Sequence, residues 1–152
     1  MPMTMGQALR KAAEAERGGA RFYRMLADKS ETERAYALFA KLSTDERKHA
    51  EALEQHADQL SSGDHESELP EPALRNLEYV PGWEDVETIN ADQAVEIALE
   101  AETHAALYYS TLADLTQGEV RGFFEGLAQI EERHAELLRD RQAELAKQEG
   151  DQ

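Results

Sequence analysis

Two short motifs in the sequence are suited to metal binding. Glu46 precedes His49 by three residues, and Glu131 precedes His134 by the same interval. On an α-helix, residues three positions apart are separated by about 300° around the axis and about 4.5 Å along it, so the carboxylate and the imidazole share a face and can reach one cation. Acidic residues fill 32 of 152 positions, so one such match alone would be a weak signal.

An internal repeat relates the two motifs and strengthens that signal. Residues 8–16 align with residues 94–102 at an offset of 86, and residues 46–53 align with residues 131–138 at an offset of 85. Each half of the chain is therefore expected to form a similar helical hairpin. If the two hairpins pack face to face, residues repeated on their inner faces meet around a pseudo-two-fold axis.

Glutamates also lie on the apolar stripes of the other two predicted helices. Glu16 shares its stripe with Ala12 and Tyr23, and Glu102 lies at the equivalent place in the second half. A carboxylate on a core-facing stripe costs several kcal/mol unless it is paired or bound to a metal. Four glutamates balance the charge of two ferrous ions if the histidines are neutral. The predicted metal ligands are Glu16, Glu46, His49, Glu102, Glu131 and His134.

The elements that must position these residues are predicted to be helical. Small and apolar residues recur at helical spacing over residues 6–28, 32–60, 91–115 and 119–148, and Asn90 is a candidate N-cap. Residues 61–90 contain three of the four prolines and are expected to be an irregular crossover. The predicted fold is an all-α, ferritin-like four-helix bundle of two helical hairpins joined by a long crossover, with residues 1–152 forming one domain.

The donor set matches a known one, because ferritin-like di-iron bundles use a glutamate from each of two helices and Glu-x-x-His from the other two. The chain resembles the rubrerythrin branch of that superfamily from about residue 8 to residue 138. The resemblance is carried by Glu16 with Phe22-Tyr23, Phe39 with Glu46-Arg47-Lys48-His49-Ala50, Glu102 with Tyr108-Tyr109, and Phe123-Phe124 with Glu131-Glu132-Arg133-His134.

The resemblance implies a role for each ligand. Glu46 and Glu131 would bridge both iron ions, Glu16 with His49 would complete one iron, and Glu102 with His134 would complete the other. The sequence departs from the family pattern in two places. It contains no cysteine, so rubredoxin-type iron is absent and electrons would come from a separate donor protein. Ala105 stands where typical rubrerythrins have a second glutamate, which argues against ligand exchange on oxidation.

The composition excludes several other kinds of partner. The formal net charge of −16 disfavours nucleic acids and anionic membranes, because both are negatively charged. No apolar run is long enough to cross a bilayer, and the first residues do not resemble a secretion signal, so a cytoplasmic protein is expected. Two hairpins joined by a long link can also exchange between chains, and we expect a homodimer in which the hairpins could be exchanged.

Three functions follow from these observations. The resemblance favours a non-haem di-iron oxidoreductase that reacts with peroxide or dioxygen in oxidative-stress defence. A ferroxidase or iron-handling protein would use the same ligands and an acidic surface. A metal-free helical interaction module is the third reading. Two iron ions are the expected cofactors, and manganese or a mixed pair remains open because oxygen and imidazole ligands suit each of these metals.

Overall fold

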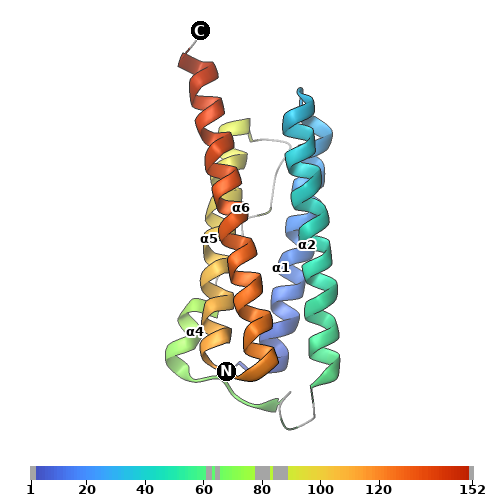
Figure 1. The fold of residues 1–152 in the computed structure, drawn as a ribbon, viewed down its shortest axis with the longest axis vertical. Helices are drawn as coiled ribbons and strands as arrows, with labels where there is room; N and C mark the ends of the chain where they lie inside the picture. The colour runs from blue at the N-terminus through green and yellow to red at the C-terminus, as the bar shows by residue number, and fades with distance from the viewer. Residues whose placement is uncertain (1–2, 61–62, 64–65, 78–82, 84–88, 151–152) are drawn as a thin grey trace. The chain divides into compact units, whose positions relative to one another are not determined.

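The computed structural model describes residues 3–60, 63, 66–77, 83 and 89–150 of the chain. The helices labelled in Figure 1 are α1 (Met5–Lys29), α2 (Glu33–Gln59), α4 (Glu71–Leu77), α5 (Ala91–Asp114) and α6 (Gly118–Gly150). Within these described ranges there is no β-strand, and one isolated bridge pairs Thr4 with Glu68. None of the described helices is long and apolar enough to span a membrane.

The chain forms two compact units. Unit 1 is Met1–Val80 and contains α1, α2 and α4, while unit 2 is Pro81–Gln152 and contains α5 and α6. In each unit the two long helices pack along each other, so each unit is built on one helical hairpin. A single domain over residues 1–152 remains a prediction.

The hairpin of unit 1 is held by local caps and by an apolar interface. Thr4 and Gln7 form a reciprocal capping box at the start of α1, with hydrogen bonds of 2.9 and 3.1 Å. Tyr23 of α1 is fully buried and stacks on Phe39 of α2, with ring centroids 6.3 Å apart. Burial of one such ring contributes about 1.5–3 kcal/mol. The paired helices thus fix which faces of α1 and α2 point inward.

The crossover contains a helix that the sequence analysis did not predict. Residues 61–90 were expected to be irregular because of their prolines, but α4 forms within them, with Pro72 in its first turn. Proline is tolerated there because the amide hydrogens of a first turn have no helical partner. The ammonium of Lys11 donates to the carbonyl of Leu77 at the end of α4, at 2.8 Å. Part of the predicted crossover lies outside the described residues.

The hairpin of unit 2 begins at the predicted cap. Asn90 accepts from the backbone of Gln93, and the Gln93 side chain accepts from the backbone of Asn90, both at 2.9 Å. A tight turn follows α5, and Gly118 opens α6 with a φ of 68°, which residues with a Cβ rarely adopt. The two helices bury large side chains, among them Tyr109, Leu112, Phe124 and Leu138.

Candidate metal centre

The structure places the six predicted ligands in two triads, one in each unit. The first triad lies in unit 1, where α1 supplies Glu16 and α2 supplies Glu46 and His49. Their exposed fractions are only 3, 4 and 8%. One ligand atom from each residue lies within 4.8 Å of those of the other two, and His49 Nδ1 is 3.6 Å from Glu16 Oε2. These three side chains can therefore reach one cation.

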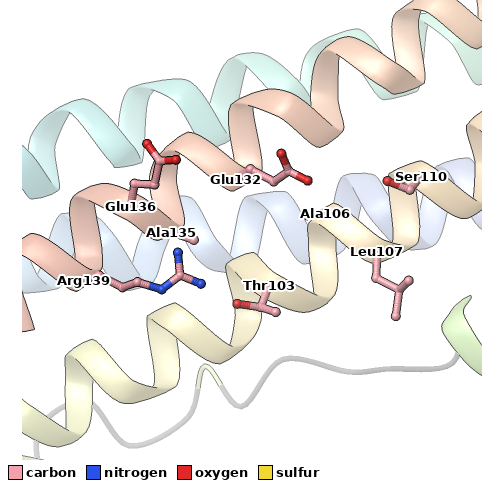
Figure 2. Close-up of a pocket in the computed structure, with 8 residues that line it drawn as sticks. All are labelled: Thr103, Ala106, Leu107, Ser110, Glu132, Ala135, Glu136 and Arg139. Carbon is pink, nitrogen blue, oxygen red and sulfur yellow. The ribbon is translucent and has the colours of Figure 1, made fainter.

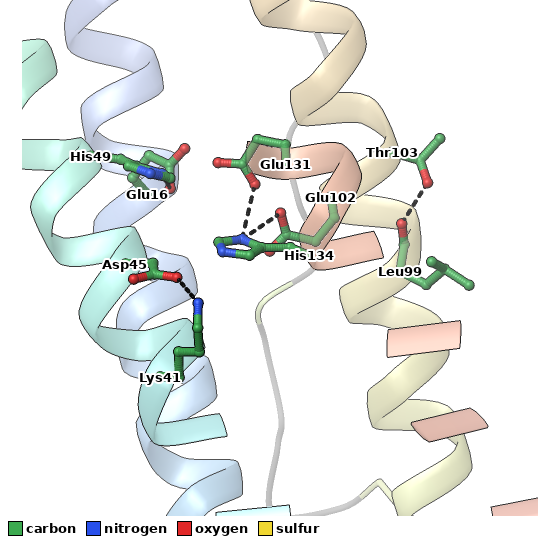
Figure 3. A network of polar contacts seen from close by, with 9 residues as sticks. All are labelled: Glu16, Lys41, Asp45, His49, Leu99, Glu102, Thr103, Glu131 and His134. Atoms are coloured by element: carbon green, nitrogen blue, oxygen red, sulfur yellow. Dashed lines mark hydrogen bonds and ion pairs between the residues drawn. The ribbon is translucent and has the colours of Figure 1, made fainter. Parts of the chain in front are cut away.

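The second triad repeats this arrangement in unit 2. Glu102 comes from α5, and Glu131 and His134 come from α6, with exposed fractions of 2, 0 and 0%. His134 Nδ1 is 3.5 Å from Glu102 Oε2 and 3.5 Å from Glu131 Oε2, and Figure 3 shows the imidazole turned toward both carboxylates. One ligand atom from each of the three residues lies within 4.8 Å of the others. The two triads thus share residue types, helix positions and spacing.

The local sequence explains why charged side chains are placed inside. Glu16 lies on the buried stripe of α1 between Ala12 and Gly19, and both of these neighbours are small. Glu102 has Ala98 four residues before it and Ala106 four residues after it on α5, and both alanines are buried. Small residues one turn before and after a glutamate leave room for its carboxylate beside the partner helix. Both helices therefore combine a polar group with an otherwise apolar face.

Among the described residues, no buried lysine or arginine balances the negative charge of the four triad glutamates. In the described part of the chain, the buried polar or charged residues are the six members of the triads and Thr111. The hydroxyl of Thr111 donates to the carbonyl of Leu107 at 2.8 Å. No lysine or arginine of the described residues is buried. Neutralisation must come from protons or from bound cations, because burying charge without compensation costs several kcal/mol.

The donor set fits a first-row transition metal. Each triad offers two carboxylates and one imidazole, which suit iron and manganese and lack the thiolates of many zinc sites. Two carboxylates also balance one divalent ion. The side chains of each triad therefore fit one of the two metal ions that the sequence predicts.

Other acidic and histidine residues lie outside the triads. Glu14 and Glu100 are also repeated in the two halves, but they lie about 200° around their helices from Glu16 and Glu102, and both are exposed. His56 and His104 have no histidine at the equivalent position of the other repeat, which predicts that they lie on the surface. Both are half-buried, and neither belongs to a potential metal group of the described residues. His65 lies outside the described residues. Ala105, at the position of the missing second glutamate, is half-buried on α5.

The fold is ferritin-like. The structure is similar to that of a protein from Thermotoga maritima, provisionally assigned as a ferritin-like diiron-carboxylate protein, with a TM-score of 0.76 and 22% sequence identity. The match covers 94% of this chain and 97% of that one. The predicted fold class, an all-α ferritin-like bundle of two hairpins and a long crossover, is confirmed.

The sequence shows which family the chain belongs to. The family model named Rubrerythrin matches residues 7–147, which is nearly the whole chain, and the chain belongs to the rubrerythrin family. No curated protein matches the chain significantly by sequence.

Proposed function

We propose that the chain is a non-haem di-iron oxidoreductase and that the two triads together hold its two metal ions. The observation that carries the proposal is the burial of four glutamates and two histidines at repeat-equivalent positions, without a buried basic residue in the described chain. Membership of the rubrerythrin family supports iron as the metal. As the resemblance to rubrerythrins implies, Glu46 and Glu131 would be ligands of both ions, Glu16 and His49 would complete one, and Glu102 and His134 would complete the other.

The chemistry requires two electrons from the centre. When bound, two ferrous ions would supply one electron each, and these two electrons with two protons would reduce one molecule of peroxide to two of water. The chain contributes fixed ligands whose four negative charges compensate the metal charge, and its ligand atoms are shielded from bulk water. Because the chain contains no cysteine for a thiolate redox centre, a separate donor protein would return the electrons.

The proposal is tested by metal analysis followed by a peroxide assay. Protein purified without added metal is expected to carry about two iron ions per chain. After anaerobic reduction, stopped-flow mixing should consume about one peroxide for every two ferrous ions, as the electron balance requires. The matched control is the Glu14→Gln/Glu100→Gln variant, because these exposed glutamates lie two positions before Glu16 and Glu102 in both repeats. This variant should retain both metal and activity.

The other two functions give different results in the same experiment. A ferroxidase would oxidise added Fe(II) with dioxygen over many turnovers and release ferric iron, with slow consumption of peroxide. A metal-free interaction module would contain far less than one metal per chain and would not bind Fe(II). Either result would replace the proposed peroxidase or oxidase activity.

A further inference from the structure

Charge is unevenly distributed along the chain. Residues 3–60 carry ten basic and ten acidic residues, whereas residues 61–152 carry six basic and twenty-two acidic residues. Two acids of residues 3–60 belong to the buried first triad, so the other charges of this hairpin sum to a small positive value. The formal net charge of the whole chain is −16. The hairpin of α1 and α2 is therefore the part of the chain that least repels an acidic partner.

Most arginines of this hairpin lie on one stripe of α1. Four of them follow one another at intervals of seven, four and three residues, which places them within about 60° of one another around the helix. These four are Arg10, Arg17, Arg21 and Arg24. Together with Arg47 of α2 we call them the arginine seam. Its members are exposed, except that Arg17 is half-buried.

Cross-helix contacts place the seam along the joint between α1 and α2. Three of its arginines each contact a side chain of α2. These contacts join Arg10 to Asp58 at 3.1 Å, Arg17 to Glu54, and the guanidinium of Arg24 to the ring centre of Tyr36 at 5.9 Å. The hydrogen bond from Arg17 lowers the pKa of Glu54, so this pair stays charged near neutral pH. The outer ends of the seam are thus fixed in place by their partners.

The middle of the seam carries positive charge that is not compensated in this way. Ser43 of α2 donates to the carbonyl of Ala20 at 2.8 Å, so the two helices touch here. Arg21 follows Ala20, and Arg47 lies one turn after Ser43. Both arginines are exposed, and neither forms an ion pair with another described residue. Two guanidinium groups are therefore available to an acidic partner.

The second hairpin lacks this feature, although its inner residues repeat those of the first. The positions of the four arginines in α1 correspond to Glu96, Thr103, Leu107 and Ser110 in α5. Glu132 stands in place of Arg47. Here the joint between α5 and α6 is an open groove of about 470 Å³, with Glu132 and Glu136 among its lining residues (Figure 2). Packing of such a hairpin therefore does not require the arginines.

The seam lies close to the first triad. Arg17 directly follows the predicted ligand Glu16, and Arg47 directly follows Glu46. The ligands lie on the buried side of α1 and α2, and the seam lies on the exposed side. The two are therefore separated by about one helix diameter, about 10–12 Å with side chains. A redox group seated on the seam can pass an electron over such a distance in one step.

We propose that the arginine seam is the docking surface for the separate electron donor, and that this donor is a small acidic one-electron carrier protein. This inference rests on the proposed function, which requires such a donor. At each encounter the carrier loses one electron and one ferric ion becomes ferrous, so two encounters restore the electrons that one peroxide consumes. Redox complexes of this kind have small interfaces, and charge complementarity governs how fast they form.

Binding tests the docking surface without reference to activity. The probe is an oxidised plant-type [2Fe–2S] ferredoxin, an acidic one-electron carrier. In surface plasmon resonance at low ionic strength, the Arg21→Glu/Arg47→Glu variant should bind it at least about 10-fold more weakly than the wild type, because like charges then face each other. The Arg21→Lys/Arg47→Lys variant keeps both charges and should bind nearly as well as the wild type. Added salt should weaken the wild-type complex.

Stopped-flow reduction of the oxidised metal-loaded protein tests the electron transfer. Reduced ferredoxin is compared with reduced methyl viologen, a small reductant that needs no docking surface. The ratio of the two rates should be at least about 10-fold lower in Arg21→Glu/Arg47→Glu than in the wild type. The matched control is Arg75→Glu/Lys147→Glu, which changes the net charge equally at exposed positions outside the seam. Its binding and its rate ratio should equal those of the wild type.

The outcomes separate the docking surface from the proposed function. If the wild type does not bind the ferredoxin, or if the seam variant and the control lose binding equally, the docking proposal is overturned, even where methyl viologen reduces the metal centre. If methyl viologen does not reduce the metal centre of the wild type, the di-iron function itself is wrong, and the seam has no electron donor to bind.

Discussion

Burial separates four glutamates from every other acidic residue in the described part of the chain. Glu16, Glu46, Glu102 and Glu131 are at most 4% exposed, whereas the other aspartates and glutamates whose side-chain burial the structure describes are half-buried or exposed. Each of the four lies within reach of a buried histidine and a second glutamate. These four buried glutamates are the ones for which we propose metal binding. A single substitution can test each of them.

Loss of one motif histidine should affect one metal position. We expect His49→Ala to lower the metal content from about two ions per chain to about one, because the first triad would lose its only nitrogen donor. Isothermal titration of the apoprotein with Fe(II) under anaerobic conditions would show the missing site. His56→Ala is the control on the same helix and should retain both ions. Equal losses in the two variants would show that the ligand set is wrong.

Alkaline stability should depend on Tyr108. Burial raises the pKa of its phenol above the ordinary value of 10.0. The folded state therefore keeps the proton more tightly than the unfolded state, so this group's stabilising contribution is fully present below pH 10 and is lost as the pH rises beyond it. Urea unfolding between pH 8 and pH 11 should show a smaller loss of unfolding free energy in Tyr108→Phe than in the wild type. If the unfolding free energies of the two proteins fall equally as the pH rises, burial of the Tyr108 phenol is not the cause.

At the scale of elements, local sequence explains most of the helix ends. Asn90 was predicted to cap α5, and the structure gives it a full capping box with Gln93. The equivalent box of Thr4 and Gln7 begins α1. Such caps satisfy amide hydrogens that have no partner within the helix. Both capped helices carry a predicted metal ligand, Glu16 on α1 and Glu102 on α5, and substitution of Asn90 tests the cap of α5.

Removal of this cap gives a measurable loss of stability. Asn90→Ala should lower the free energy of unfolding by about 1 kcal/mol. For a chain of this length such a loss lowers the melting temperature by about 2–4 °C, measurable by differential scanning calorimetry. Asn90→Ser keeps a side-chain acceptor and should recover most of the difference. If the serine variant melts as low as the alanine variant, the hydrogen bond at the cap is not the cause.

The sequence predicts inner faces better than outer ones. Glu16 follows Ala12 by four residues, and His49 follows Glu46 by three, so the members of each pair share one face of a helix. Both hairpins bury this face, so the same spacing recurs in each. Helix α4 was missed because its prolines were interpreted as breakers, although Pro72 fits a first helical turn. The open groove between α5 and α6 has a different cause (Figure 2). It lies at exposed positions such as Thr103, where the two repeats carry different residues, so the shared repeat pattern does not predict it.

At the scale of the whole molecule, the two hairpins share many of their buried residues but differ in their exposed residues. The inner residues of the hairpins are matched, so both can contribute equivalent ligands to a centre. The outer residues differ in charge, so the hairpins can be distinguished by a partner.

Metal removal should lower the stability of the whole chain, and the effect of one substitution on the melting temperature should have opposite signs with and without metal. Bound metal stabilises the folded state by about 2.7 kcal/mol per site when the free metal is 100-fold above its dissociation constant, so the metal-bound protein should melt at least about 5 °C higher than the apoprotein.

Glu131→Gln removes a fully buried negative charge. In the apoprotein this relieves repulsion within the second triad, so the variant should melt higher than the wild type. With metal present it should melt lower than the wild type, because a neutral amide is a poorer ligand than a carboxylate. Calorimetry of both proteins, with and without Fe(II) under anaerobic conditions, measures all four melting temperatures. If metal shifts neither protein, the buried carboxylates are neutralised by protons and the chain is a metal-free helical module.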